Sequence, residues 1–194
     1  WINMINAGRR VAPMGNSDSH TVQSNVAGIP RTYVRVNDKN PAAIDVAEVA
    51  DAVRRGAVMA TTGPFITVSA NGAGPGDLAQ TTDGNIELII NVQSAPWIPV
   101  DRIRVLADGD ELLSFDLKED GYLPPITIGP LSIVAKEDAW ITILADSNRE
   151  MGPFLPTRQR PIRPMAMTGP IRIDADGDGK WTPPLATAYI EVAS

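Results

Sequence analysis

The sequence contains no cysteine and only one histidine, His20, among its 194 residues. The absence of cysteine excludes disulfides and cysteine-ligated zinc, and it leaves the cellular compartment open. No apolar run approaches the roughly 20 residues of a membrane-spanning helix, so no membrane span is expected. The net charge is −6 and no basic patch is present, so nucleic acid is not expected as a partner.

The opening residues, WINMINAGRR, have neither an initiator Met nor the layout of a signal peptide. We therefore expect the chain to be part of a longer protein. Any targeting segment would precede Trp1, which leaves a secreted or periplasmic location open. Within residues 1–20 the pattern indicates the end of a short amphipathic helix that stops at Gly8, followed by a brief extended segment.

Residues 45–56, DVAEVADAVRRG, predict a helix. Asp45 is a good N-cap, Glu48 is placed to complete a capping box, and Gly56 ends the helix. Apolar residues at helical spacing predict a buried stripe of Val46, Val49, Ala50, Val53 and Ala57. Folding explains all of these residues, so the helix is assigned no catalytic role.

From Phe65 onward the hydrophobic pattern changes to period two, which predicts short strands separated by turns. The predicted strands cover residues 65–70, 85–92, 102–107, 111–117, 126–134, 140–146, 171–173 and 188–192. Asp108 and Gly109 favour a tight hairpin turn between two of them. Residues 151–170 are rich in Pro and Arg and are expected to form a long surface loop. The sequence therefore predicts a mainly β protein built on an antiparallel β-sandwich.

The segment MGNSDSH places Asp18 two residues before His20 in a glycine-led turn. A carboxylate oxygen and an imidazole nitrogen are suitable ligands for Zn²⁺, Mn²⁺ or Fe²⁺. The spacing alone also fits a polar surface turn, because a catalytic zinc typically has three protein ligands.

The stretch AGRRVAPMGNSDSH, followed by GIPRTYV, an Asp-containing helix and ATTGPF, resembles the end of the catalytic domain of the PHP (polymerase and histidinol phosphatase) superfamily. It looks closest to the CehA/McbA-type metallohydrolases. The last metal-binding motif of that family is a G-x-S-D-S-H turn, which residues 15–20 match. The resemblance covers roughly the first 70 residues and is most specific in the first 35.

The resemblance implies that residues 1–63 are the last helix and strand elements of a distorted (β/α)₇ barrel. Residues 64–194 would then form a β-sandwich accessory domain. It also implies hydrolysis of a small-molecule phosphoester, carboxylic ester or carbamic ester by a metal-bound hydroxide, with Asp18 and His20 among the ligands of Zn, Mn or Fe. The family's other ligands lie in a barrel segment N-terminal to this one, so the chain alone is not expected to be active.

Arg31 lies just after the predicted metal loop. In the intact site it could hold a substrate anion through a bidentate contact. The alternatives are an ordinary surface arginine or a partner for a barrel carboxylate.

A calcium-loop pattern occurs near the C-terminus, where three alternating aspartates precede a glycine: Asp174, Asp176, Asp178 and Gly179. The main-chain carbonyl of Lys180 would be the next ligand, but Leu185 stands where an EF-hand needs a bidentate Glu. Three close carboxylates repel one another without a cation, although Asp-Gly runs are also common solvated turns. The alternative function is therefore a non-catalytic β-sandwich module for binding or structure, stabilised by Ca²⁺.

Overall fold

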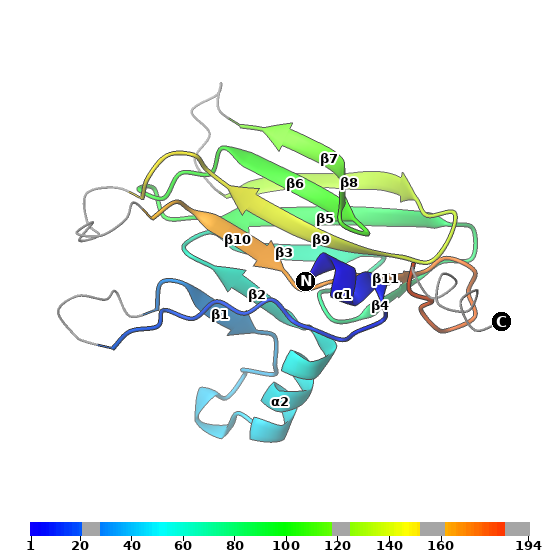
Figure 1. Ribbon diagram of the computed structural model, residues 1–194, viewed down its shortest axis with the longest axis horizontal. Coiled ribbons are helices and arrows are strands. Elements are labelled where there is room, and N and C mark those ends of the chain that lie inside the picture. The colour runs from blue at the N-terminus through cyan, green and yellow to red at the C-terminus, as the bar shows by residue number, and fades with distance from the viewer. Residues whose placement is uncertain (21–27, 118–124, 152–161, 185–194) are drawn as a thin grey trace.

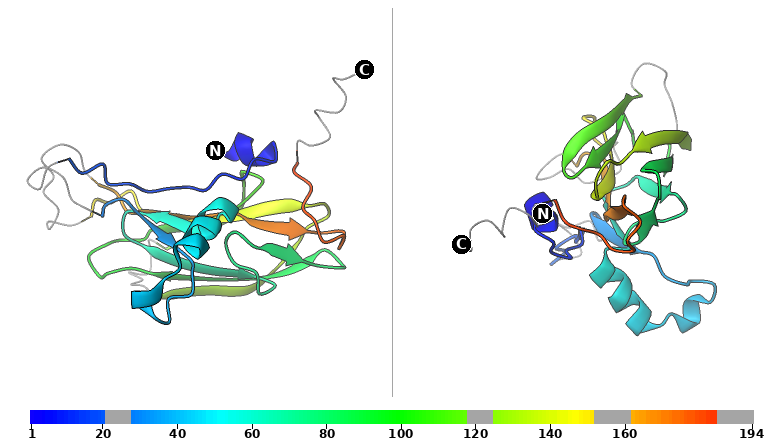
Figure 2. Two further views of the ribbon diagram at one scale, coloured as in Figure 1. Left: turned by 90° about the horizontal axis from the view of Figure 1, so that it is seen from below. Right: turned by 90° about the vertical axis from the view of Figure 1, so that its right-hand side faces the viewer.

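The structure is a computed structural model that describes residues 1–20, 28–117, 125–151 and 162–184. Two β-sheets pack face to face, as the side views in Figure 2 show. This confirms the predicted mainly β, sandwich-like fold. The described helices are α1 (Ile2–Asn6), the 3₁₀ turn η1 (Pro41–Ala43) and α2 (Val46–Arg55). None of them is long and apolar enough to cross a membrane.

The smaller sheet is antiparallel and has the order β3-β5-β8. Its strands are β3 (Phe65–Ala70), β5 (Asn85–Gln93) and β8 (Ile126–Val134). Alternate residues of β5 have no exposed surface: Ile86, Leu88, Ile90 and Val92. Their burial against the second sheet stabilises the fold by roughly 1.5–3 kcal/mol per side chain.

The larger sheet has eight strands centred on β9 (Ala139–Asp146). One path through it runs β1-β2-β10-β9-β11-β4, and the β6–β7 hairpin joins β9 along its other edge (Figure 1). These strands are β1 (Arg31–Val34), β2 (Val58–Thr61), β4 (Leu78–Gln80), β6 (Arg102–Ala107), β7 (Asp110–Asp116), β10 (Met165–Thr168) and β11 (Ile171–Asp174). Neighbouring strands are antiparallel except for the parallel pair β11 and β4.

Seven predicted strands are confirmed to within one residue at each end: β3, β5, β6, β7, β8, β9 and β11. The prediction of one long loop over residues 151–170 is wrong, because β10 forms at Met165–Thr168 and pairs with both β2 and β9. Residues 152–161 of that loop and the predicted strand at 188–192 lie outside the described residues.

Helix α2 is capped as predicted at both ends. The Asp45 carboxylate accepts a hydrogen bond from the Ala47 amide at 2.8 Å, and Gly56 adopts the left-handed conformation. The predicted capping box is wrong, because the Glu48 carboxylate instead accepts from the Asn37 amide at 2.7 Å.

The predicted buried stripe of α2 is wrong at its first position. Val46 is 81 % exposed, whereas Ala52, nearer the C-terminal end, is fully buried. Burial increases along the helix because its C-terminal part lies nearest the sheet and its first turn extends away from it (Figure 1).

After α1, the described part of the N-terminal segment, up to residue 20, crosses the outer face of the larger sheet, as the left view of Figure 2 shows. The Trp1 and Trp140 rings meet edge to face at 5.5 Å, and Trp140 Nε1 donates to Asn6 Oδ1 at 2.6 Å. Asn6 in turn donates to the Asp108 carbonyl at 2.9 Å. These contacts attach α1 to β9 and to the β6–β7 turn, and they leave Trp140 fully buried.

Strands β1 and β2 fall within residues 1–63, the segment predicted to end a barrel. Here they pair with each other in antiparallel fashion, and β2 also pairs with β10. Among the described residues they are therefore continuous with the sandwich, and no barrel element is distinguished from it. The division at residues 63 and 64 stays a prediction.

Candidate metal-binding sites

Asp18 and His20 lie in an exposed turn that follows the buried residues Pro13 and Gly15. Asp18 adopts a φ of 50°, a left-handed conformation that Asp tolerates better than most residues. His20 Nδ1 lies 2.6 Å from the main-chain oxygen of Asp18 and 3.6 Å from its Oδ1. The His20 side chain is 75 % exposed and the Asp18 side chain is 88 % exposed, so both are accessible to a ligand.

The short contact between His20 and Asp18 fixes the tautomer of the neutral imidazole. A main-chain carbonyl only accepts hydrogen bonds, so Nδ1 carries the proton and Nε2 keeps a free lone pair. Metal-binding histidines usually donate their other ring N–H to a carbonyl or carboxylate in this way. His20 is therefore arranged as metal-binding histidines are, with Nδ1 donating to a carbonyl and Nε2 able to bind a metal.

The described part of the chain supplies no third ligand near this pair. In residues 1–20, 28–117, 125–151 and 162–184, no further carboxylate or imidazole joins Asp18 and His20 in a cluster of three. The turn by itself thus offers one carboxylate and one imidazole.

The turn is joined to β1 at Gly15. The Gly15 amide donates to Thr32 Oγ1 at 2.8 Å, and that hydroxyl donates back to the Gly15 carbonyl at 3.0 Å. A Cβ on Gly15 would lie 2.7 Å from the main-chain oxygen of Arg31, so only glycine permits this approach. The structure therefore brings the start of the predicted metal loop beside Arg31.

The Arg31 side chain lies along the surface of β1. Its Nε donates to the Tyr33 hydroxyl at 3.0 Å, its Nη1 to the Gly28 carbonyl at 3.3 Å, and its guanidinium lies 5.2 Å from the Tyr33 ring centre. Within the described ranges Arg31 forms no ion pair with a carboxylate. Its charge is therefore available to an anion.

Three carboxylates come together at the end of β11. One oxygen each from Asp138, Asp174 and Asp176 lies within 4.8 Å of the others. Asp174 is fully buried, Asp138 half-buried and Asp176 exposed. The sequence predicted two of these residues but missed Asp138, which precedes β9. Only the pairing of Ile173 with Ala139 places it beside Asp174, and no local pattern indicates that pairing.

Main-chain amides surround the Asp174 carboxylate. Its two oxygens accept from the Gly177 amide at 2.7 Å and from the Gly179 amide at 2.8 Å. Burial raises the pKa of Asp174, but the hydrogen bonds from Gly179 and Gly177, with help from Gln80 and Asp176, outweigh it and leave the pKa below its ordinary value. Asp174 is therefore an ionised carboxylate inside the protein.

The other predicted calcium ligands are arranged differently. Asp178 is not a member of the three-carboxylate cluster, and its Oδ1 accepts from the Lys180 amide at 2.7 Å. The Asp138 carboxylate accepts from the Ala175 amide at 2.8 Å and the Thr182 amide at 2.7 Å. Hydrogen bonds thus tie the loop to the β8–β9 connection, and the cluster still offers carboxylate oxygens to a hard cation such as Ca²⁺.

Comparison of the chain with protein-family models, with curated proteins and with solved structures finds no match.

Proposed function

We propose that this chain carries the last metal-ligand loop of a PHP-type metal-dependent hydrolase. In this proposal residues 1–63 carry the last metal-ligand loop of the catalytic barrel. Their strands β1 and β2 also complete the sheet of the accessory β-sandwich that residues 64–194 form. The observation that carries the proposal is the contact between His20 Nδ1 and the Asp18 carbonyl, which leaves the Nε2 of the neutral ring unprotonated, as a metal ligand must be. The G-x-S-D-S-H match of residues 15–20 supports it independently.

Each residue then has a defined role. Asp18 and His20 hold Zn, Mn or Fe together with ligands from a barrel segment N-terminal to this one. A metal held there would lower the pKa of its bound water toward about 7, which would provide a nucleophile for ester or phosphoester hydrolysis at neutral pH. The Asp18 carbonyl keeps the His20 ring in its binding tautomer. Arg31, on the strand to which the loop is bonded, holds the anionic group of a small-molecule substrate.

The test is to substitute Asp18→Ala and His20→Ala separately in the intact protein that contains the N-terminal ligands. Elemental analysis should show loss of bound metal, and kcat/KM for nitrophenyl esters and phosphoesters should fall by about 100-fold or more. Asp38→Ala, at another exposed aspartate, is the matched control and should change neither. Unchanged metal content and hydrolysis in both variants would overturn the assignment.

A second candidate is a non-catalytic binding or structural module stabilised by Ca²⁺. The convergence of Asp138, Asp174 and Asp176 favours it. Calcium should then raise the melting temperature of the wild-type chain and of Asp178→Asn, whose carboxylate lies outside the cluster. It should not do so in Asp138→Asn or Asp176→Asn. No thermal shift with millimolar calcium would leave the loop held by its amide hydrogen bonds alone.

A further inference from the structure

A pocket of about 300 Å³ lies where the N-terminal segment, β4 and the loop after β11 meet. Because Ile171 and Ile173 of β11 lie in the core between the sheets, Arg172 between them faces the opposite side. Three cationic side chains and one tryptophan line this pocket, which we call the cationic pocket: Arg10, Arg172, Lys180 and Trp181.

Arg172 is a buried cation with few partners. Its side chain belongs to a residue only 6 % exposed, its Nη1 donates to the Arg55 carbonyl at 3.3 Å, and its Nε has no partner among the described residues. Burial, reinforced by the charge of Arg10, lowers the pKa of the Arg172 guanidinium from its ordinary value. A buried charge without a counter-charge is costly, so this arrangement favours an anion nearby.

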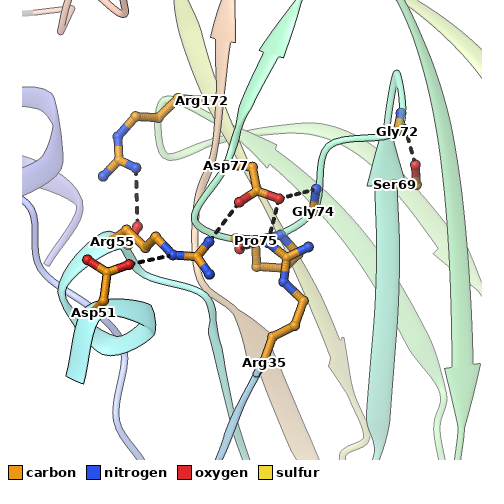
Figure 3. Close-up of polar contacts among 9 residues, drawn as sticks. All are labelled: Arg35, Asp51, Arg55, Ser69, Gly72, Gly74, Pro75, Asp77 and Arg172. Atoms are coloured by element: carbon orange, nitrogen blue, oxygen red, sulfur yellow. Dashed lines mark hydrogen bonds and ion pairs between the residues drawn. The ribbon is translucent and has the colours of Figure 1, made fainter. Parts of the chain in front are cut away.

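Asp77 also lines the pocket, but its carboxylate is already used. Arg55 Nη1 lies 2.7 Å from Asp77 Oδ1, and Arg35 pairs with Oδ2 (Figure 3). Figure 3 shows Arg172 directed at the Arg55 main chain instead of at Asp77. The pocket therefore keeps an uncompensated positive charge.

Further hydrogen-bond donors belong to the other residues that line the pocket. Trp181 Nε1 is buried and has no hydrogen-bond partner in the described ranges, and the Arg172 guanidinium lies 5.3 Å from the Trp181 ring centre. Arg10 and Lys180 are exposed, and neither forms an ion pair with any described residue. Three cations and one indole N–H thus gather in a chain whose net charge is −6.

We propose that the cationic pocket binds a phosphate group, either as inorganic phosphate or on a small phosphomonoester. A tetrahedral dianion has the charge and the number of acceptor oxygens to engage several cations and the indole at once, whereas a carboxylate has two oxygens and one charge. Arg172 forms the buried floor of this site, and Arg10 and Lys180 form its exposed rim. The proposal does not depend on the hydrolase function, because it involves neither Asp18 nor His20.

The test is calorimetric titration of the full chain with inorganic phosphate in a low-salt, phosphate-free buffer. We expect one phosphate per chain, with affinity reduced about tenfold by Arg10→Gln and by Lys180→Gln. These residues are exposed, so both variants should fold. Arg9→Gln is the matched control, since it removes the same charge from the neighbouring exposed residue, which does not line this pocket.

A second readout locates the bound anion. Phosphate should shift one indole N–H resonance in a ¹H–¹⁵N spectrum, and that resonance should be absent from Trp181→Phe. Phenyl phosphate as a parallel titrant distinguishes the two sources: tighter binding than inorganic phosphate identifies an esterified group, and weaker binding identifies the free ion. The proposal is overturned by no binding at millimolar phosphate, by an equal loss in Arg9→Gln, or by acetate binding as tightly.

Discussion

At the scale of single residues, the two charged side chains of β11 are both buried, but only one of them is well hydrogen-bonded. Asp174 is fully buried, and two glycine amides donate to its carboxylate. Arg172 lies two residues earlier on the same face of the strand, and its side chain has one long hydrogen bond to the described residues. The loop that follows β11 thus compensates the negative charge from its own backbone and leaves the positive charge for a partner.

The compensation of Asp174 predicts a pH dependence of stability. Its folded-state pKa lies below the usual 3.8, so the ionised carboxylate stabilises the fold above the unfolded-state pKa. That contribution should be lost as the pH falls through the lower, folded-state pKa. In urea unfolding, Asp174→Asn should reduce stability at pH 7, because an amide group cannot accept from both glycine amides. The variant should also show a smaller loss of stability below about pH 4.

Asp178→Asn is the control for this experiment, since Asp178 is exposed in the same loop. It should keep nearly the wild-type dependence of unfolding free energy on pH. Parallel pH profiles for wild type and Asp174→Asn would contradict the role given to this carboxylate.

At the scale of elements, the strands of six or more residues could all be predicted from the sequence, whereas among the shorter strands only β11 was predicted. Strand β5 alternates cleanly over Asn85–Gln93, and one face of it fills the core. Strands β1, β2, β4 and β10 have three or four residues each. So few residues give no readable period, and these strands form because a neighbouring strand offers hydrogen-bonding groups. Two of the three residues of the acidic cluster were predicted, and Asp138 was missed for the same reason, since only the pairing of β11 with β9 brings it to the cluster.

In helix α2 the contribution of the N-cap to stability can be measured apart from packing, because the N-terminal turn of the helix is exposed. Asp45→Ala removes the acceptor for the Ala47 amide and should lower the free energy of unfolding by about 1 kcal/mol. Asp51→Ala in the same helix removes only the exposed pair with Arg55 and should cost less than about 0.5 kcal/mol. Urea denaturation of both variants checks this ranking. An equal loss of unfolding free energy in the two variants would show that the cap contributes no more than the exposed ion pair.

At the scale of the whole molecule, the described residues form one structure held together by segments distant in the sequence. Helix α1 covers Trp140 on the outer face of β9, and the Gly15 segment is bonded to β1. Strand β2 in turn lies between β1 and β10 in the larger sheet. The N-terminal third of the chain therefore completes the sandwich as well as presenting Asp18 and His20.

This arrangement predicts a single cooperative unfolding transition for the chain, seen at the same urea concentration by circular dichroism and by tryptophan fluorescence. The segment 64–194 alone should not fold cooperatively, because β10 loses its partner β2 and Trp140 loses its cover. The segment 28–194 is the matched comparison, since it keeps β1 and β2 and lacks α1. It should fold with a loss of about 2–4 kcal/mol from the exposure of Trp140. Two separate transitions, or a 64–194 segment as stable as the full chain, would instead support an independent domain beginning at residue 64.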